Sequence, residues 1–167
     1  MEKIFSNREE QLIYLGASVA SGCWPCTKYH LKRSSEAGLT DIELANAFAI
    51  AISIRDKATR SMESLANNRN KVENIEEVKQ ESLSRSDIIV GIAATYSVNF
   101  PLGLETYLSL GRDNGLRSEE FKEIIALSKS VIGKARAHTD MVSDRIGIVS
   151  QGENKAETDC CSSHNCK

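Results

Sequence analysis

With 167 residues and a mass of 18.4 kDa, the chain is long enough for one hydrophobic core and too short for two ordinary domains. Its formal net charge of -2 supplies no positive field, so neither nucleic acid nor an acidic membrane surface is expected as a partner. No run approaches the roughly 20 consecutive apolar residues of a membrane-spanning helix, and the start MEKIFSNREE lacks the apolar segment of a signal peptide, so we expect a cytoplasmic protein.

The first two predicted helices follow from capping and turn residues. Ser6 can accept a hydrogen bond from the Glu9 amide while the Glu9 side chain reaches back, and this capping box predicts a helix over about 7–21. Proline is tolerated in a first helical turn because its missing amide proton would have no partner there. A second helix is therefore expected from about Pro25 to Gly38.

A third helix is predicted by another capping box, formed by Thr40 and Glu43. The apolar residues over 42–54 cover a wide arc of this helix, so we expect it to be buried on more than one side. Residues 67–86 are polar and mixed in charge, which predicts a linker or an exposed helical connector.

An internal repeat relates the two halves of the chain. A shift of 76 residues, which becomes 77 after one inserted residue, aligns identical residues in the two halves. The aligned pairs are Ala17 with Ala93, Ser21 with Ser97, Pro25 with Pro101, Gly38 with Gly115, Leu39 with Leu116, Glu43 with Glu120, Ala49 with Ala126, Ser53 with Ser130, Lys57 with Lys134 and Ala58 with Ala135. The same three-helix unit is therefore expected twice.

These patterns predict an all-α fold, a helical bundle built from two tandem copies of a three-helix unit. The expected organisation is a single domain over 1–150, with repeat one at about 7–66, a linker at about 67–86 and repeat two at about 87–138, followed by a flexible cysteine-rich tail over 151–167.

The segment CWPC, followed by a histidine, is the candidate reactive centre. Only the thiolate of a cysteine is a good nucleophile, and a CxxC at a helix start favours it because free amides and the helix dipole stabilise negative charge. His30 lies four residues after Cys26, so on a regular helix its imidazole can approach the sulfur and take the thiol proton. This favours Cys26 as the attacker on a peroxide and Cys23 as the resolving thiol, whereas the first cysteine attacks in thioredoxin-like exchange.

The second copy does not repeat this chemistry. Asn99 and Leu102 stand where the first copy has its cysteine pair, and Thr106 or Tyr107 stands opposite the histidine. The fold is therefore expected to be duplicated, and the reactive centre is not.

Simpler roles are open to residues near this centre and elsewhere in the chain. A CxxC pair can be half of a zinc site, but no second CxxC or HxxxH accompanies it, so redox use is favoured over metal binding or inert packing. Trp24 can shape a substrate pocket, although packing is the more common role. His138 is expected to cap the carboxyl end of a helix that begins near Ser118.

The stretch from Gln11 to Ala58 resembles the carboxymuconolactone decarboxylase and alkylhydroperoxidase D superfamily, through its CxxCxxxH motif, a glycine-ended helix and an acidic capping box. The resemblance covers about a third of the chain directly and most of it through the repeat. It implies an all-helical homo-oligomer, a trimer or hexamer, that reduces hydroperoxides through a redox-active cysteine pair. No cofactor is expected to be required; the substrate would be a hydroperoxide or a disulfide, and the reductant a thiol protein or a small dithiol.

In the superfamily's peroxidases, a glutamate 12 residues before the first cysteine joins the histidine in a proton relay, and the matching position here holds Gln11. Gln11 can hydrogen-bond a water but cannot take up a proton, so it keeps the geometry and loses the acid–base function. Glu10 is adjacent but about 100° round a helix from Gln11, so its use in a relay stays an open alternative. This departure weakens the prediction of peroxidase activity more than that of disulfide exchange, which needs only the thiolate.

Two alternative functions stay open. Cys160, Cys161, His164 and Cys166 place three sulfurs and an imidazole within seven residues, a composition that suits Cu(I), Zn(II) or a trivalent metalloid. The protein would then be a soft-metal or metalloid-binding protein, unless these thiols are incidental or exchange disulfides with the CxxC pair. A carboxymuconolactone decarboxylase-type enzyme rests on the superfamily alone, since no carboxylate-binding arginine set is identified.

Overall fold

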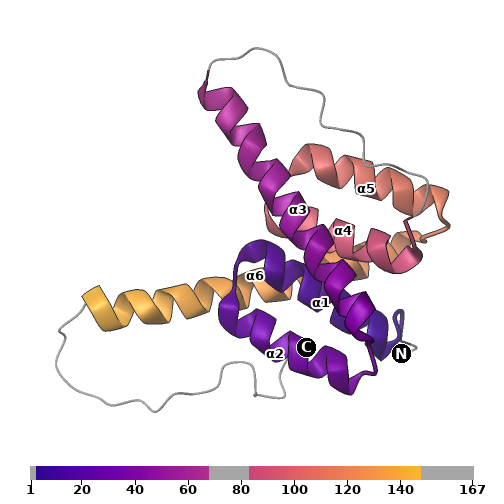
Figure 1. Cartoon of the computed structure of the whole chain (residues 1–167), viewed down its shortest axis with the longest axis horizontal. Coiled ribbons are helices and arrows are strands. Elements are labelled where there is room, and N and C mark those ends of the chain that lie inside the picture. The colour runs from indigo at the N-terminus through magenta and orange to yellow at the C-terminus, as the bar shows by residue number, and fades with distance from the viewer. Residues whose placement is uncertain (1–2, 68–82, 148–167) are drawn as a thin grey trace.

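The computed structural model of the chain describes residues 3–67 and 83–147, and these ranges contain six helices and no strand (Figure 1). The helices are α1 (Asn7–Ser21), α2 (Trp24–Glu36), α3 (Asp41–Ala66), α4 (Arg85–Ser97), α5 (Pro101–Asp113) and α6 (Ser118–Gly147). The predicted all-helical fold is confirmed. None of the described helices is long and apolar enough to cross a membrane. Most of the predicted linker and the whole predicted tail lie outside the described residues.

Capping boxes start three of these helices. The Glu9 amide donates to Ser6 Oγ at 3.3 Å, and the Ser6 amide donates back to the Glu9 carboxylate at 3.0 Å. The second predicted box has the same arrangement at the start of α3. A third box joins Ser84 to Asp87 and starts α4 inside the segment predicted as a linker. Helix α4 therefore begins just before the predicted end of the linker at about residue 86, because aspartate serves in this box as glutamate does in the others.

Backbone hydrogen bonds fix the register of the repeat. The Cys23 amide donates to the Ser18 carbonyl where α1 meets α2, and the Phe100 amide donates to the Thr95 carbonyl where α4 meets α5. The Ser18 and Thr95 hydroxyls are both buried, and each donates to the carbonyl four residues earlier. These pairs are separated by 77 residues, so the predicted shift of 76 before the insertion is wrong by one residue. Identities among small residues can align two repeats with an error of one residue, whereas the equivalent hydrogen bonds identify matching positions directly.

The corrected register shows what replaces the reactive centre in the second copy. Phe100 and Gly103 take the places of the two cysteines, and Tyr107 takes the place of the histidine. The Phe100 ring occupies the space that a side chain on residue 103 would need, and the Tyr107 ring packs directly over Gly91. Aromatic packing therefore fills the second site.

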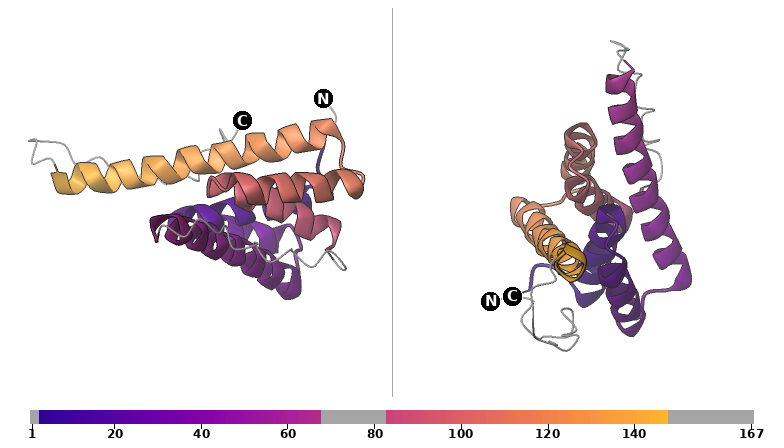
Figure 2. Two further views of the ribbon diagram at one scale, coloured as in Figure 1. Left: turned by 90° about the horizontal axis from the view of Figure 1, so that it is seen from above. Right: turned by 90° about the vertical axis from the view of Figure 1, so that its left-hand side faces the viewer.

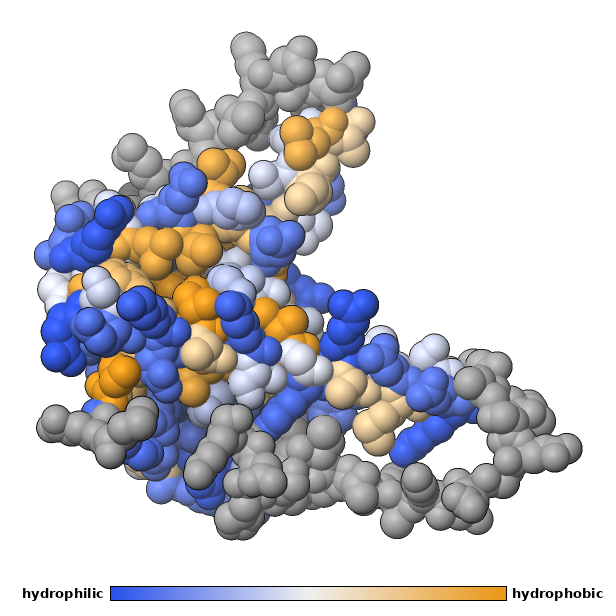
Figure 3. Space-filling view, turned by 180° about the vertical axis from the view of Figure 1, so that it is seen from behind, coloured by the Kyte–Doolittle hydropathy of each residue, from blue (hydrophilic) through white to orange (hydrophobic). Residues whose placement is uncertain are grey.

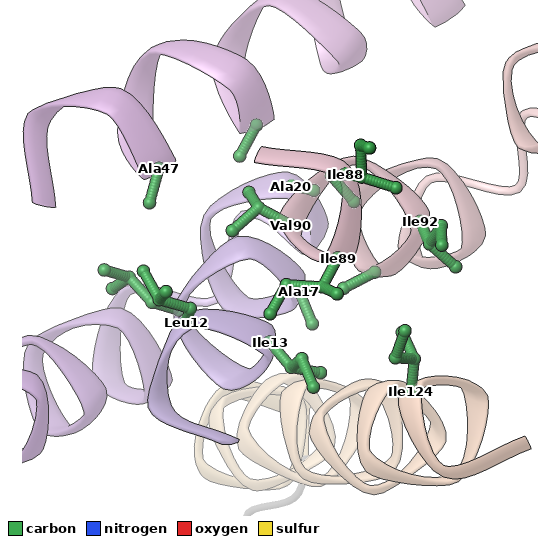
Figure 4. Close-up of a cluster of buried hydrophobic side chains, with 14 of the residues drawn as sticks. Leu12, Ile13, Ala17, Ala20, Ala47, Ile88, Ile89, Val90, Ile92 and Ile124 are labelled. Atoms are coloured by element: carbon green, nitrogen blue, oxygen red, sulfur yellow. The ribbon is translucent and has the colours of Figure 1, made fainter. Parts of the chain in front are cut away.

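The centre of the fold is the contact between α1 and α4, and each of these helices also contacts α3 and α6. A Cβ on Gly16 of α1 would lie 3.0 Å from Val90 Cγ1 of α4, so their close approach depends on glycine. Figure 4 shows the buried side chains of both helices meeting, with Ile124 of α6 against them. The ends of α3 and α6 extend beyond this core (Figures 1 and 2).

The third helix is buried on one side, so the prediction that it is buried on more than one side is wrong for the single chain. Its buried residues are Leu44, Ala47, Ala51 and Ile54. Its large exposed apolar residues are Ile42, Ile52, Met62 and Leu65. The projecting end of α3 carries apolar side chains at the surface (Figure 3), because it extends past the helices that could cover it. Assembly into a homo-oligomer stays a prediction.

Candidate redox site

The cysteine pair lies in the turn between α1 and α2. Gly22 ends α1 in the left-handed conformation, with φ of 71°, and turns the chain directly into α2. Cys23 and Cys26 form a disulfide, with their Cα atoms 5.3 Å apart. Cys23 is the N-cap of α2, and its Sγ accepts the Cys26 amide hydrogen at 3.3 Å. The amide and the positive end of the helix dipole favour negative charge on the Cys23 sulfur once the pair is reduced.

His30 lies on α2 as predicted. The Nδ1 side of its ring faces α1, and the ring is not part of the group that both sulfurs form with another histidine, described below. Its Nδ1–H donates to Gln11 Oε1 at 3.2 Å. The ring stacks on Tyr14, with centroids 4.6 Å apart, and meets the edge of Tyr29 at 5.0 Å. The structure therefore brings together Gln11 and His30, the pair that the resemblance implies. Glu10, the open alternative, is bonded to Lys3 at 3.3 Å.

Burial lowers the pKa of His30 to about 4, and the positive charges of Lys134 and Arg33 act in the same direction. The ring is 5% exposed, which agrees with burial as the main cause. His30 is therefore neutral at physiological pH, so it can orient a neighbour by hydrogen bonding but carries no proton to donate as an imidazolium.

The neutral state of His30 predicts a loss of stability in acid. A histidine in the unfolded chain has a pKa near 6.5, whereas the folded protein holds the pKa of His30 at about 4, so the unfolded state binds more protons between these values. The free energy of unfolding should fall by up to about 3 kcal/mol as the pH drops from about 6.5 to about 4. Urea denaturation at pH 7 and pH 4 measures this, and the His30→Gln variant serves as control. An equal loss in both proteins would contradict the assignment to His30.

The structure adds His138, which the sequence predicted to be a helix cap, to the site. A ring nitrogen of His138 and the sulfurs of Cys23 and Cys26 all lie within 4.8 Å of one another. Among the described residues, this is the one group of three or more His, Cys, Asp or Glu side chains close enough to share an ion, and His30 is not in it. The predicted helix-capping role of His138 is wrong, because α6 continues beyond it to Gly147.

Positive side chains come to the neighbourhood of the site from α2, α3 and α6. Lys134, one turn before His138 on α6, and Arg33 on α2 both act on His30. Arg55 of α3 lies against Gly22 and donates to the Ala20 carbonyl at 3.4 Å. Nearby positive charge favours a thiolate over a thiol. The surroundings of the cysteine pair are therefore suited to a nucleophilic sulfur.

The indole of Trp24, which follows Cys23 in the sequence, is exposed to solvent. Trp24 is 77% exposed, whereas Cys23 and Cys26 are 6% and 1% exposed. The favoured packing role for Trp24 is therefore wrong, because both cysteines face inward at the first turn of α2 and the two residues between them are left in solvent. The candidate metal ligands Cys160, Cys161, His164 and Cys166 lie outside the described residues.

Comparison with known families supports the resemblance. Residues 2–66 match the carboxymuconolactone decarboxylase family. The cysteine pair, His30 and Gln11 lie inside this segment, whereas Lys134 and His138 lie outside it. No curated protein and no solved structure matches the chain. The recognised family is thus confirmed on the first repeat, and the contribution of α6 to the site comes from the structure alone.

Proposed function

We propose that this protein, whose first repeat matches the carboxymuconolactone decarboxylase family, is a thiol-dependent oxidoreductase that cycles Cys23 and Cys26 between dithiol and disulfide. The observation that carries the proposal is the disulfide at the start of α2, with the Cys26 amide directed at the Cys23 sulfur. Electrons would come from a small dithiol or a thiol protein. They would go to a disulfide or a hydroperoxide, with no cofactor required.

In disulfide exchange, the Cys23 thiolate attacks one sulfur of the substrate disulfide. A bond forms between Cys23 and that sulfur, the substrate S–S bond breaks, and the second substrate sulfur leaves as a thiolate that takes up a proton. Cys26 then attacks Cys23 and releases the first substrate sulfur. Two electrons and two protons pass from the protein dithiol to the substrate, and an external dithiol reverses the cycle on the protein.

A disulfide suits this site better than a hydroperoxide. Attack of a thiolate on a peroxide breaks the O–O bond and leaves an alkoxide, a poor leaving group that must receive a proton in the same step. Gln11 has no proton to relay, and the pKa of His30 at about 4 leaves that ring neutral. A thiolate leaving group makes no such demand near neutral pH. Disulfide exchange is therefore the leading activity, with hydroperoxide reduction the slower one.

The experiment compares both oxidants on the reduced, full-length protein under argon. Samples are mixed with glutathione disulfide or tert-butyl hydroperoxide at equal concentration, quenched with an alkylating agent and analysed by peptide mass spectrometry. We expect the Cys23–Cys26 disulfide to form at least about tenfold faster with the disulfide, following the difference in leaving groups. Peptide resolution separates this pair from the three tail cysteines. A pair that stays reduced with both oxidants would refute the proposed function.

A further inference from the structure

We propose that His138 is the proton-transfer residue of the cysteine pair, so that a helix of the second repeat completes the redox site of the first. This inference rests on the proposed function and deepens it, because it assigns the proton step to a residue outside the family segment. Its basis is the cluster in which one His138 nitrogen and both sulfurs lie within 4.8 Å of one another.

The burial of the sulfurs creates the need for such a group. Cys26 is 1% exposed, so a proton that leaves its thiol has no direct contact with bulk water. His138 is only partly buried and lies on α6, which packs against both α1 and α2. A separation below 4.8 Å can be bridged by a small side-chain rotation or by one water, and such distances commonly shorten when a site is engaged. His138 can therefore connect the buried thiol to solvent.

The other ionisable groups around the pair are less suited to this role. His30 uses Nδ1 for Gln11, stacks on Tyr14 and meets the edge of Tyr29, and its pKa of about 4 makes it a weak base. Lys134, Arg33 and Arg55 are cations that offer no acceptor for a proton. An imidazole can both take up and release a proton, which is what a thiol that ionises and later re-forms requires. The cations favour the thiolate, and His138 moves the proton.

The resolving step then balances within the site. With Cys23 joined to a substrate sulfur, the ring nitrogen of His138 accepts the Cys26 thiol proton. The Cys26 thiolate attacks Cys23, the Cys23–Cys26 bond forms, and the bond from Cys23 to the substrate sulfur breaks. The departing substrate thiolate takes the proton from the His138 imidazolium. His138 ends the step neutral, and no further oxidant or reductant is consumed.

The test is the rate at which the reduced pair closes with glutathione disulfide, measured across pH 5.5 to 8.5 by quenched peptide mass spectrometry on full-length variants. His138→Gln should slow closure by roughly 100-fold, a typical contribution of general acid–base catalysis, and should change the shape of the pH profile. Arg136→Gln, on the same helix but exposed, is the matched control and should stay within about twofold, as surface substitutions do. Closure of the His138→Gln protein at the wild-type rate would overturn the inference.

Chemical rescue separates a proton-transfer role from a structural one. His138→Ala should be slow, and free imidazole in the buffer should restore its closure rate at least tenfold without changing the rate of the wild-type protein. A folded His138→Ala protein that imidazole does not accelerate would overturn the assignment. Failure of the wild-type pair to close at all would instead refute the proposed function, so the two failures are distinguishable.

Discussion

Replacing Cys23 with serine should lower turnover of a disulfide substrate by more than about 1000-fold, because a serine hydroxyl does not ionise at neutral pH and cannot form a disulfide. The Cys26 amide that favours the Cys23 thiolate would then face an uncharged hydroxyl. Turnover is measured with glutathione disulfide and a small dithiol, by the loss of free dithiol. Turnover of the Cys23→Ser protein at the wild-type rate would refute the proposed chemistry.

The matched variant, Cys26→Ser, tests the order in which the sulfurs act. It should also lose turnover, but it should retain the first attack and accumulate a mixed disulfide with the substrate at Cys23. The reason is that Cys23 is the N-cap of α2 and the more exposed of the two, at 6% against 1%. Peptide mass spectrometry locates the bound substrate. A mixed disulfide found on Cys26 in the Cys23→Ser protein, and none in Cys26→Ser, would reverse the order.

Gln11→Glu should raise hydroperoxide turnover by about 100-fold, since general acid–base assistance contributes of this order. The new carboxylate would lie where Gln11 Oε1 now meets His30 Nδ1 at 3.2 Å. A negative charge at that distance raises the pKa of His30 from about 4, and the carboxylate can itself take up a proton. The pair could then deliver a proton to the alkoxide that leaves when the O–O bond breaks.

Two comparisons make the Gln11→Glu result specific. Disulfide exchange should change little in this variant, because its leaving group needs no such relay. Glu10→Gln should leave hydroperoxide turnover unaltered, because Glu10 is bonded to Lys3 on the surface. An NMR titration of His30 should follow the rise in its pKa. A raised pKa without faster hydroperoxide reduction would show that this relay does not limit the reaction.

Local rules were enough to predict the first three helices and part of the site. The capping boxes at Ser6 and Thr40 set the starts of α1 and α3, since a cap depends on residues within one turn. The placement of the cysteine pair at the first turn of α2 followed from Pro25. The contact between Gln11 and His30 joins two helices, and only the family resemblance pointed to it.

Features that depend on how helices cross could not be predicted in this way. His138 reaches the cysteines because α6 packs on α1 and α2. The repeat predicts the order of the helices along the chain, but it does not predict that α6 of the second repeat packs on helices of the first. The hydrogen-bond partner of His30 does not follow from spacing for a similar reason, since i, i+4 spacing places two residues on one face but does not fix which group a ring nitrogen meets. The register of the repeat likewise could not be set by matching alanines and serines, because backbone hydrogen bonds fix it.

Aromatic side chains fill the position in the second repeat that matches the cysteine pair of the first, and this limits how many electrons the helical part of the chain can hold. Phe100 and Tyr107 take up the space that a second cysteine pair and histidine would need, so the described residues contain one centre that holds one pair of electrons. The duplicated half instead supports the first site, to which its helix α6 brings His138. Substitutions in α6 can then adjust the reactivity of the sulfurs without touching the helix that carries them.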